Sequence, residues 1–239
     1  TKAKIATPRN KMSNQVAVMA LINIKPQAKY SGIARLMFNR FSLYRPQGLI
    51  LQKHMGSGKN GGFLISPSGT HQGLFCLFEG LEQANRFMVE SPLLDWYRSH
   101  ASELFTVKLR AYSVKGRWSG HQLQESIAPP TSGPIASLTR ASIKPTRALS
   151  FWSQASSAQT DLQQSTGCLI SAGIGEAPVL RQATFTIWNS QAAMDAYARS
   201  GAHLTAIKAA MQGNYFSESM FARFQPFDAE GSWKGKRLD

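Results

Sequence analysis

The chain has 239 residues, enough for one large domain or two small ones that bury a core without disulfides. Its two cysteines, Cys76 and Cys168, each lie in an apolar run, which predicts buried reduced thiols in a cytoplasmic protein and is too sparse for a zinc or iron–sulfur site. The formal net charge is +14, yet the first acidic residue is Glu79, so we expect the basic N-terminal third to meet an anionic membrane face or an acidic protein.

Nucleic acid is not an expected partner, because no RNA- or DNA-reading motif is visible. No apolar run is long enough to span a membrane, and the opening residues TKAKIATPRN lack the apolar core of a signal peptide. We therefore expect a cytoplasmic protein, soluble or peripheral to the inner face of the membrane.

The first half of the chain predicts a strand over residues 16–24 and then an amphipathic helix over 30–45. Two interpretations of this helix stay open: it packs on its own sheet, or it lies on a membrane surface. Its apolar residues share one face and three arginines flank them: Ile33, Leu36, Met37, Phe41 and Tyr44, with Arg35, Arg40 and Arg45.

Two further strands are predicted in GLILQKH and GLFCLFEG, followed by one helix over about 81–100 and a strand over 104–114. The Gly-rich segment 56–69 predicts a mobile loop, and its spacing does not match a phosphate-binding loop. His54 and His71 lie beside it and are weak candidates for a site, as are His100 and His121 at the ends of elements.

The second half repeats this order, with strands predicted at 135–143, 167–176, 181–190 and 215–224 and a helix over 191–211. We therefore divide the chain into a ferredoxin-like half at 1–127, a linker at 128–134 and a second ferredoxin-like half at 135–239. The predicted fold class is α+β, with tandem β-α-β-β-α-β modules whose two antiparallel sheets face each other and enclose a cavity.

His203 is the main candidate functional residue, because the two copies differ there. An ungapped alignment of residues 75–97 with the second half at an offset of 109 sets His203 over Leu94. Ser200-Gly201 then corresponds to Ser91-Pro92, a helix start, and the positive end of a helix dipole favours the neutral imidazole that binds metals. A lone histidine argues against zinc and suits the single axial ligand of haem, although an ordinary core or surface histidine is the alternative.

Five segments of the sequence resemble the spheroidene monooxygenase family: GRWSG (116–120), LTRASIKPTRALSFW (138–152), GIGEAP (173–178), QATFTIW (182–188) and AYARSGAHLTAI (196–207). The resemblance covers residues 110–235 well and the first half more loosely. It implies a haem b enzyme of the dimeric α+β barrel superfamily, working as a homodimer. It also implies oxidation of a carotenoid-like, lipophilic substrate with dioxygen and electrons from a ferredoxin, and His203 as the iron ligand.

Roles for other residues follow from this resemblance. Haem propionates need cations, and the candidates are Arg140, Lys144, Arg147 and Arg181. A dry apolar wall would be lined by Trp152, Phe185 and Trp188, although plain core packing is the alternative for each. The sequence leaves the other catalytic residues unknown. Other functions also stay open: a different lipophilic substrate, aldoxime dehydration, non-catalytic haem binding, and a cofactor-free oxygenase.

Overall fold

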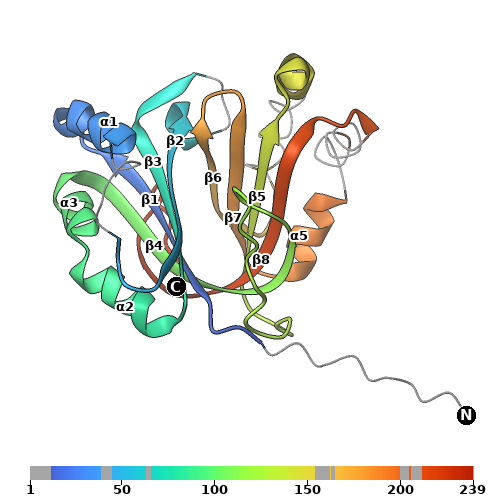
Figure 1. The fold of residues 1–239 in the computed structure, drawn as a ribbon, viewed down its shortest axis with the longest axis horizontal. Helices are drawn as coiled ribbons and strands as arrows, with labels where there is room; N and C mark the ends of the chain where they lie inside the picture. The colour runs from blue at the N-terminus through green and yellow to red at the C-terminus, as the bar shows by residue number, and fades with distance from the viewer. Residues whose placement is uncertain are drawn as a thin grey trace, which may run out of the picture.

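The computed structural model describes residues 12–38, 45–62, 66–153, 162, 165–199, 205 and 212–238. Eight antiparallel strands form a closed barrel in the order β1-β3-β2-β6-β7-β5-β8-β4 (Figure 1). The first half supplies β1 (Val16–Ile24), α1 (Lys29–Phe38), β2 (Leu49–Gly58), β3 (Pro67–Phe78), α2 (Leu81–Glu90), α3 (Pro92–His100) and β4 (Ala101–Gly116), with 3-10 turns η1 (Pro26–Ala28) and η3 (Lys59–Gly61). The second half supplies β5 (Ile135–Ile143), η4 (Pro145–Arg147), β6 (Cys168–Ala177), β7 (Arg181–Trp188), α5 (Gln191–Ala198) and β8 (Phe216–Gly231).

Each half forms its own four-stranded sheet, ordered β4-β1-β3-β2 in the first and β8-β5-β7-β6 in the second. These are equivalent orders, so the predicted tandem ferredoxin-like α+β fold is confirmed. The sheets meet along two seams. One joins the long strands β4 and β8, whereas the other joins β2 to β6 through only two residue pairs, Gly56 with Gly175 and Ser57 with Ile174.

Apolar side chains fill the space between the two sheets. Successive residues of a strand point to opposite faces, and the inward set of every strand is buried in one cluster. The cluster includes Met19, Phe75, Phe105, Leu138, Phe185 and Phe224. The predicted cavity between the sheets is therefore not found among the described residues, because large side chains interdigitate there.

The outer face of the first sheet is apolar as well, and α2 and α3 cover it (Figure 1). Val18, Ile22, Leu74 and Phe78 of the sheet pack there with Phe87 and other residues of the helices. Cys76 is buried in the same layer as a free thiol. Cys168 is also free but only partly buried, so the prediction of buried, unpaired cysteines is confirmed in full for Cys76 alone.

The structure corrects two sequence predictions in the first half. The single helix predicted over 81–100 is broken, because Ser91 has an extended backbone and its hydroxyl accepts from Leu94 N–H as the N-cap of α3. The Gly-rich segment predicted as a loop instead continues β2 and β3 into a hairpin around η3; residues 63–65 lie outside the described residues.

The amphipathic helix predicted over 30–45 is found as α1, although residues 39–44 lie outside the described part. It packs on its own sheet, since the side chain of Gln72 donates to Gly32 C=O at 2.9 Å. In the part of the chain that the structure describes, no helix has both the length and the apolar character needed to cross a bilayer.

The strand pairing also corrects the alignment of the halves. Val16 pairs with Phe78 as Ile135 pairs with Trp188, so the offset is 119 residues on β1 and β5 and 110 on β3 and β7, not 109. Helix α5 is two residues shorter than α2, so the offset beyond it is not fixed by the described residues. The pairing of His203 with Leu94 therefore stays a prediction.

The last strand of each half, β4 or β8, makes an equivalent contact with the other half. Gly116 ends β4 and Gly231 ends β8, both with φ near +80°, and a side chain on either would collide with a carbonyl of the other half. Each chain then turns inward and buries an indole, Trp118 and Trp233, whose exposed fractions are at most 1%.

A carboxylate of the opposite half binds each of these turns. Glu218 accepts from Ser119 N–H at 3.1 Å and Gly120 N–H at 3.0 Å. Glu103 accepts from Lys234 N–H at 3.1 Å and Gly235 N–H at 2.8 Å. Carboxylate–amide hydrogen bonds are among the stronger ones, so each half holds the end of the other.

We predict that Gly231→Ala destabilises the protein far more than Gly235→Ala. Both glycines have positive φ, which costs alanine about 1 kcal/mol, but only at Gly231 would the new methyl group meet the Leu104 carbonyl; nothing lies within 4 Å at Gly235. Thermal unfolding should show a Tm lower by a few degrees for Gly235→Ala and by about 10 °C for Gly231→Ala. Equal shifts would contradict this account of the seam.

Candidate functional site

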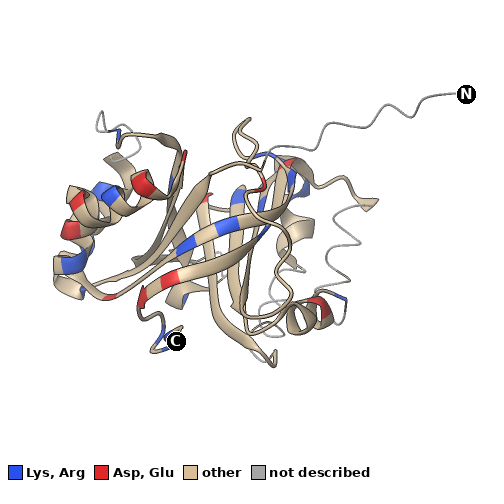
Figure 2. Cartoon of the chain, turned by 90° about the horizontal axis from the view of Figure 1, so that it is seen from below, with Lys and Arg blue, Asp and Glu red and all other residues tan. Residues whose placement is uncertain are grey.

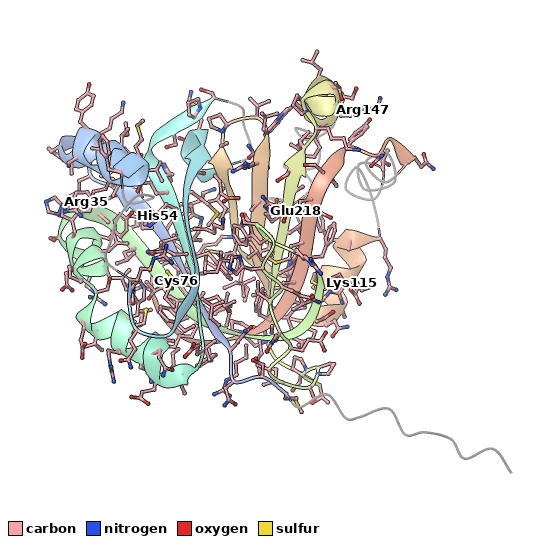
Figure 3. All side chains as sticks on the ribbon, viewed as in Figure 1. Arg35, His54, Cys76, Lys115, Arg147 and Glu218 are labelled. Carbon is pink, nitrogen blue, oxygen red and sulfur yellow. The ribbon has the colours of Figure 1, made fainter. Side chains whose placement is uncertain are left out.

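A cluster of four charged side chains lies on the inner face of the barrel beside Trp118. Arg140 of β5 contacts Glu176 of β6 at 3.4 Å and also Glu218 of β8. Lys53 of β2 binds the other oxygen of Glu176 at 2.9 Å, and Trp118 Nε1 donates to Glu176 at 2.9 Å. Figure 3 labels Glu218 within the second half.

This cluster is balanced in charge and mostly shielded from solvent: Lys53 and Glu176 are half-buried, and the side chain of Glu218 is 28% exposed. The side chain of Arg140 is 3% exposed, and its Nε has no hydrogen-bond partner among the described residues. Burial opposes ionisation of Glu176, but hydrogen bonds from Trp118 and Lys53 and the charges of Lys53 and Arg140 outweigh it and lower its pKa. Burial also raises the pKa of Glu218. Hydrogen bonds from the backbone of Gly120 and Ser119 and the charge of Arg140 outweigh this effect, so the pKa of Glu218 is lowered as well.

The outer face of the second sheet is the second candidate site. Its middle carries small side chains at alternate positions of three strands: Ser137, Thr139 and Ala141 on β5, Gly173 on β6, and Thr184 and Thr186 on β7. We call this set the small-residue shelf. A sheet face that packs directly on helices normally carries larger apolar side chains.

The first half shows what such a face looks like when helices cover it directly. By the strand pairing, Ser137 corresponds to Val18, Ala141 to Ile22 and Thr184 to Leu74. The apolar members of these pairs are all buried under the helical layer. The second half therefore carries less apolar volume than the first at these three positions.

Two tryptophans stand at opposite ends of the small-residue shelf. Trp188 ends β7 and packs under α5 with Met194 and Tyr197, while its Nε1 donates to Thr186 at 2.9 Å. Trp152 lies in the helical segment after η4, and its Nε1 donates to the Val179 carbonyl of the β6–β7 turn at 2.9 Å. Both indoles are therefore held in place beside the shelf.

Three of the four cations predicted to bind propionates lie together. Lys144 and Arg147 follow β5, and Arg181 begins β7, the strand paired with β5. Figure 3 labels Arg147 at the top of the second half. Among the described residues none of the three forms an ion pair with a carboxylate.

The structure separates Arg140 and Phe185 from this group. Both point to the inner face of the barrel, where two carboxylates already match the charge of Arg140 and Phe185 is a core residue with no exposure. Neither side chain therefore lies on the outer face of the second sheet, where the other candidate residues are. The strand alternation could have shown this, because Arg140 is in phase with the apolar residues Ala136 and Leu138.

His203 lies outside the described residues, so its surroundings are not part of the structure. The other histidines belong to the first half or the seam. His54 is buried on β2, and His100 stacks on Trp96 with ring centroids 4.4 Å apart. Burial and the charge of Lys234 lower the pKa of His71, and His121 is exposed in the turn after Trp118.

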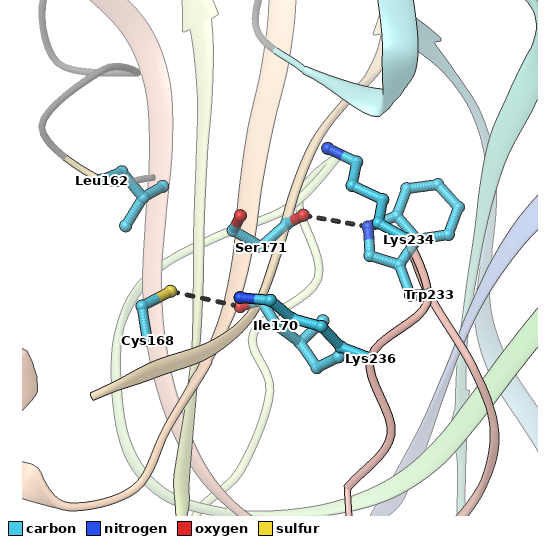
Figure 4. A pocket seen from close by; sticks show the side chains of 7 residues that line it. All are labelled: Leu162, Cys168, Ile170, Ser171, Trp233, Lys234 and Lys236. Carbon is cyan, nitrogen blue, oxygen red and sulfur yellow. Dashed lines mark hydrogen bonds between the residues drawn. The ribbon is translucent and has the colours of Figure 1, made fainter. Parts of the chain in front are cut away.

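A small pocket of about 200 Å³ opens beside Trp233 (Figure 4). Cys168, Ser171, Lys234 and Lys236 contribute to its lining, and burial raises the pKa of the Cys168 thiol to about 11 against the opposing charge of Lys236. Small-molecule sites usually span roughly 300–1,000 Å³, so this pocket is too small for a tetrapyrrole.

Comparison with known proteins decides the family. The chain is 46% identical over 230 residues to a spheroidene monooxygenase of Rubrivivax gelatinosus, covering 96% of this chain and 89% of that protein. It is 33% identical to a spheroidene monooxygenase of Rhodobacter capsulatus, with 85% of this chain and 86% of that protein covered. The chain belongs to the spheroidene monooxygenase family.

Two further comparisons complete the assignment. No model of a protein family matches the sequence. Among solved structures, an aldoxime dehydratase in complex with butyraldoxime superposes with a TM-score of 0.61 at 13% identity, over 94% of this chain and 85% of that one. At that identity the likeness shows only that this chain shares the α+β barrel fold.

Sequence reasoning missed the small-residue shelf, although its signal is present. The strand IASLTRASI has Ser137, Thr139 and Ala141 at alternate positions. The equivalent positions of VAVMALINI are all apolar: Val18, Ala20 and Ile22. A comparison of the two copies face by face would have found it. For this member of the spheroidene monooxygenase family, the shelf is the strongest feature that distinguishes one half from the other.

We predict that Glu176→Gln lowers the free energy of unfolding at pH 7 by about 3 kcal/mol, because it leaves the buried Lys53 and Arg140 short of one counter-charge. The pKa of Glu176 is lowered in the folded state, so its contribution is complete above the unfolded value of 4.5 and is lost as pH falls below it. Denaturant unfolding at pH 7 and pH 3.5 should show a smaller loss with acid in Glu176→Gln than in the parent protein. The exposed Glu82→Gln is the control, and a similar effect there would refute the assignment.

Proposed function

We propose that this protein is a haem b-dependent monooxygenase that oxidises a carotenoid or a similar long apolar polyene. The observation that supports this most is the small-residue shelf, which replaces apolar packing on one face of one half. Helix α5 covers that face, and the chain reaches His203 five residues after α5 ends at Ala198. The names of its relatives support the substrate class, because each is called a spheroidene monooxygenase.

The residues beside the shelf fit a porphyrin. The small side chains of the shelf would serve as a flat floor for the macrocycle. At the upper edge of the shelf Lys144, Arg147 and Arg181 offer charge to two propionates without competing carboxylates among the described residues. We assign the iron to His203, since one neutral imidazole is the ligand that such a site requires.

Bound haem iron supplies the activation of dioxygen, with one oxygen atom inserted into the substrate and the other reduced to water by two electrons. The chain itself has to exclude water and hold the polyene. Trp152 and Trp188 suit that task, because each indole N–H is already bonded within the protein and the ring presents only apolar surface. Thr186 Oγ1 accepts the Trp188 indole N–H, which fixes that ring to the sheet.

We further propose that a ferredoxin delivers the electrons and that the protein acts as a homodimer in contact with the inner membrane face. The high positive charge supports an acidic electron donor, because opposite charges steer association. A substrate this apolar is held in lipid, which supports a membrane contact. Aldoxime dehydration remains the alternative haem reaction, and turnover without oxygen would reveal it.

We predict that purified protein shows a strong Soret band and that His203→Ala loses most of it, because the iron loses its protein ligand. His100→Ala is the matched control, since His100 packs on Trp96 in the other half. Visible spectra and haem titration measure the effect, with haem affinity expected to fall at least tenfold for His203→Ala only. A Soret band unchanged in His203→Ala overturns the ligand assignment, and a colourless parent protein that still oxidises carotenoid overturns haem dependence.

We also predict that Thr184→Leu, which restores the residue found at Leu74, weakens haem binding by about tenfold without lowering Tm. The added side chain would occupy space over the shelf, whereas Thr184→Ser leaves that space open. Haem titration and thermal unfolding of both variants measure this. If Thr184→Leu binds haem as the parent does, the cofactor does not lie on the shelf.

A further inference from the structure

We propose that the two halves together form a surface that docks on an anionic lipid membrane. It consists of residues 25–38, 144–153 and 177–181, and we call it the upper rim. The inference deepens the proposed function, because it names the face through which a lipid-dissolved substrate is reached. All residues of the upper rim belong to the described part of the chain.

The two sides of the rim are equivalent parts of the repeat. β1 and β5 both end in Lys-Pro, Lys25-Pro26 and Lys144-Pro145, and a 3-10 turn and a helix follow in each half. Figure 1 shows α1 at the upper left and the helix after η4 at the upper right, with the β6–β7 turn between them. The fold thus places two helix starts at the same end of the barrel.

The most exposed large apolar side chains of the described residues stand at these two helix starts. Tyr30 is 82% exposed and Leu149 is 90% exposed, and the offset of 119 makes them equivalent. Met37 and Phe38 of α1 and Leu180 of the β6–β7 turn are exposed on the same rim. Apolar groups repeated at equivalent positions of two helices suit a flat apolar partner.

The charge of the rim has one sign. Its three segments contain no Asp or Glu. Lys25, Lys29 and Arg35 provide positive charge on the first half, where Arg35 stacks over Trp96 at 4.5 Å and forms no ion pair among the described residues. On the second half Lys144, Arg147 and Arg181 outnumber by one the two propionates assigned to them, so the rim keeps a net positive charge with haem bound. Cations near an anionic bilayer are attracted to it, so the rim should prefer anionic to neutral lipid.

The opposite end of the molecule differs. Figure 2 views the chain from below and shows red and blue residues interspersed on that side. There α2 carries Glu82 with Arg86 as an ion pair. A surface of mixed charge has no preference for an anionic membrane, so binding should orient the protein with its rim toward the lipid.

A membrane fits this rim better than an acidic protein does. Protein interfaces bury a contiguous apolar centre within a polar border, whereas here Tyr30 and Leu149 belong to separate helices and each projects from a cationic segment. Tyrosine and leucine with basic neighbours are the side chains that insert at the headgroup boundary. The rim is also continuous with the shelf along the chain, because Ala141 of β5 lies three residues before Lys144 and Thr184 of β7 lies three residues after Arg181.

The test uses the full chain and vesicles of phosphatidylcholine with or without phosphatidylglycerol, measured by co-sedimentation at low and high salt. The parent should bind vesicles that contain phosphatidylglycerol at least tenfold more tightly than neutral ones, and salt should weaken binding. Tyr30→Ser combined with Leu149→Ser should weaken it at least tenfold. The control is Val89→Ser, which removes a 75% exposed apolar side chain from α2 outside the rim.

The proposal is overturned if the parent does not bind vesicles. It is also overturned if Val89→Ser weakens vesicle binding as much as the rim variant does. So does a rim variant that loses only the complex with an acidic ferredoxin. Haem content and turnover of detergent-solubilised carotenoid are measured in parallel and should not change in the rim variant. If the parent binds vesicles through the rim but holds no haem, the proposed function fails while the docking surface stands.

Discussion

The barrel depends on one contact that is made twice. The last strand of each half ends at a glycine that packs against the other half, and a tryptophan that follows it is buried between the sheets. A glutamate of the other half then binds the turn after that tryptophan. Because Trp118 and Trp233 enter the shared core, neither sheet can bury its inner face alone. The two modules therefore fold as one unit, although the sequence presents them as separate halves. The rest of the molecule is free to vary outside this contact.

That freedom is used on the outer faces. In the first half the sheet and its helices share a dense apolar layer, which makes this side a rigid support. In the second half Thr184 and its neighbours give up that layer, and cations gather at its upper edge. Under the proposed function, stability and chemistry are divided between copies of one module. The proposed site omits apolar packing that the other half and the common core supply.

The sequence predicts the topology and most strands, since long apolar runs end at clear Lys-Pro or glycine positions, as in Val16–Ile24 and Ile135–Ile143. It predicts helix limits less well: amphipathic spacing continues across Ser91, and the Ser91-Pro92 pair is the signal of the break. The propionate role predicted for Arg140 came from its charge and its place in a family-like segment, whereas the phase of the strand turns its side chain to the inner face. The alignment slipped by one residue on β3 and β7 because neighbouring apolar and small residues match almost equally well in either register.

The charged cluster at the weak seam shows what tandem fusion permits. A barrel assembled from two identical single modules would carry every side chain in duplicate, so an arginine at the position of Arg140 and its acidic partners would all occur twice. In this chain the counterpart of Arg140 is the core residue Leu21, and that of Glu176 is Ser57, whose hydroxyl binds Gly173. Covalent linkage thereby permits an ion cluster that is not repeated by the symmetry of the fold, which two identical subunits could not form.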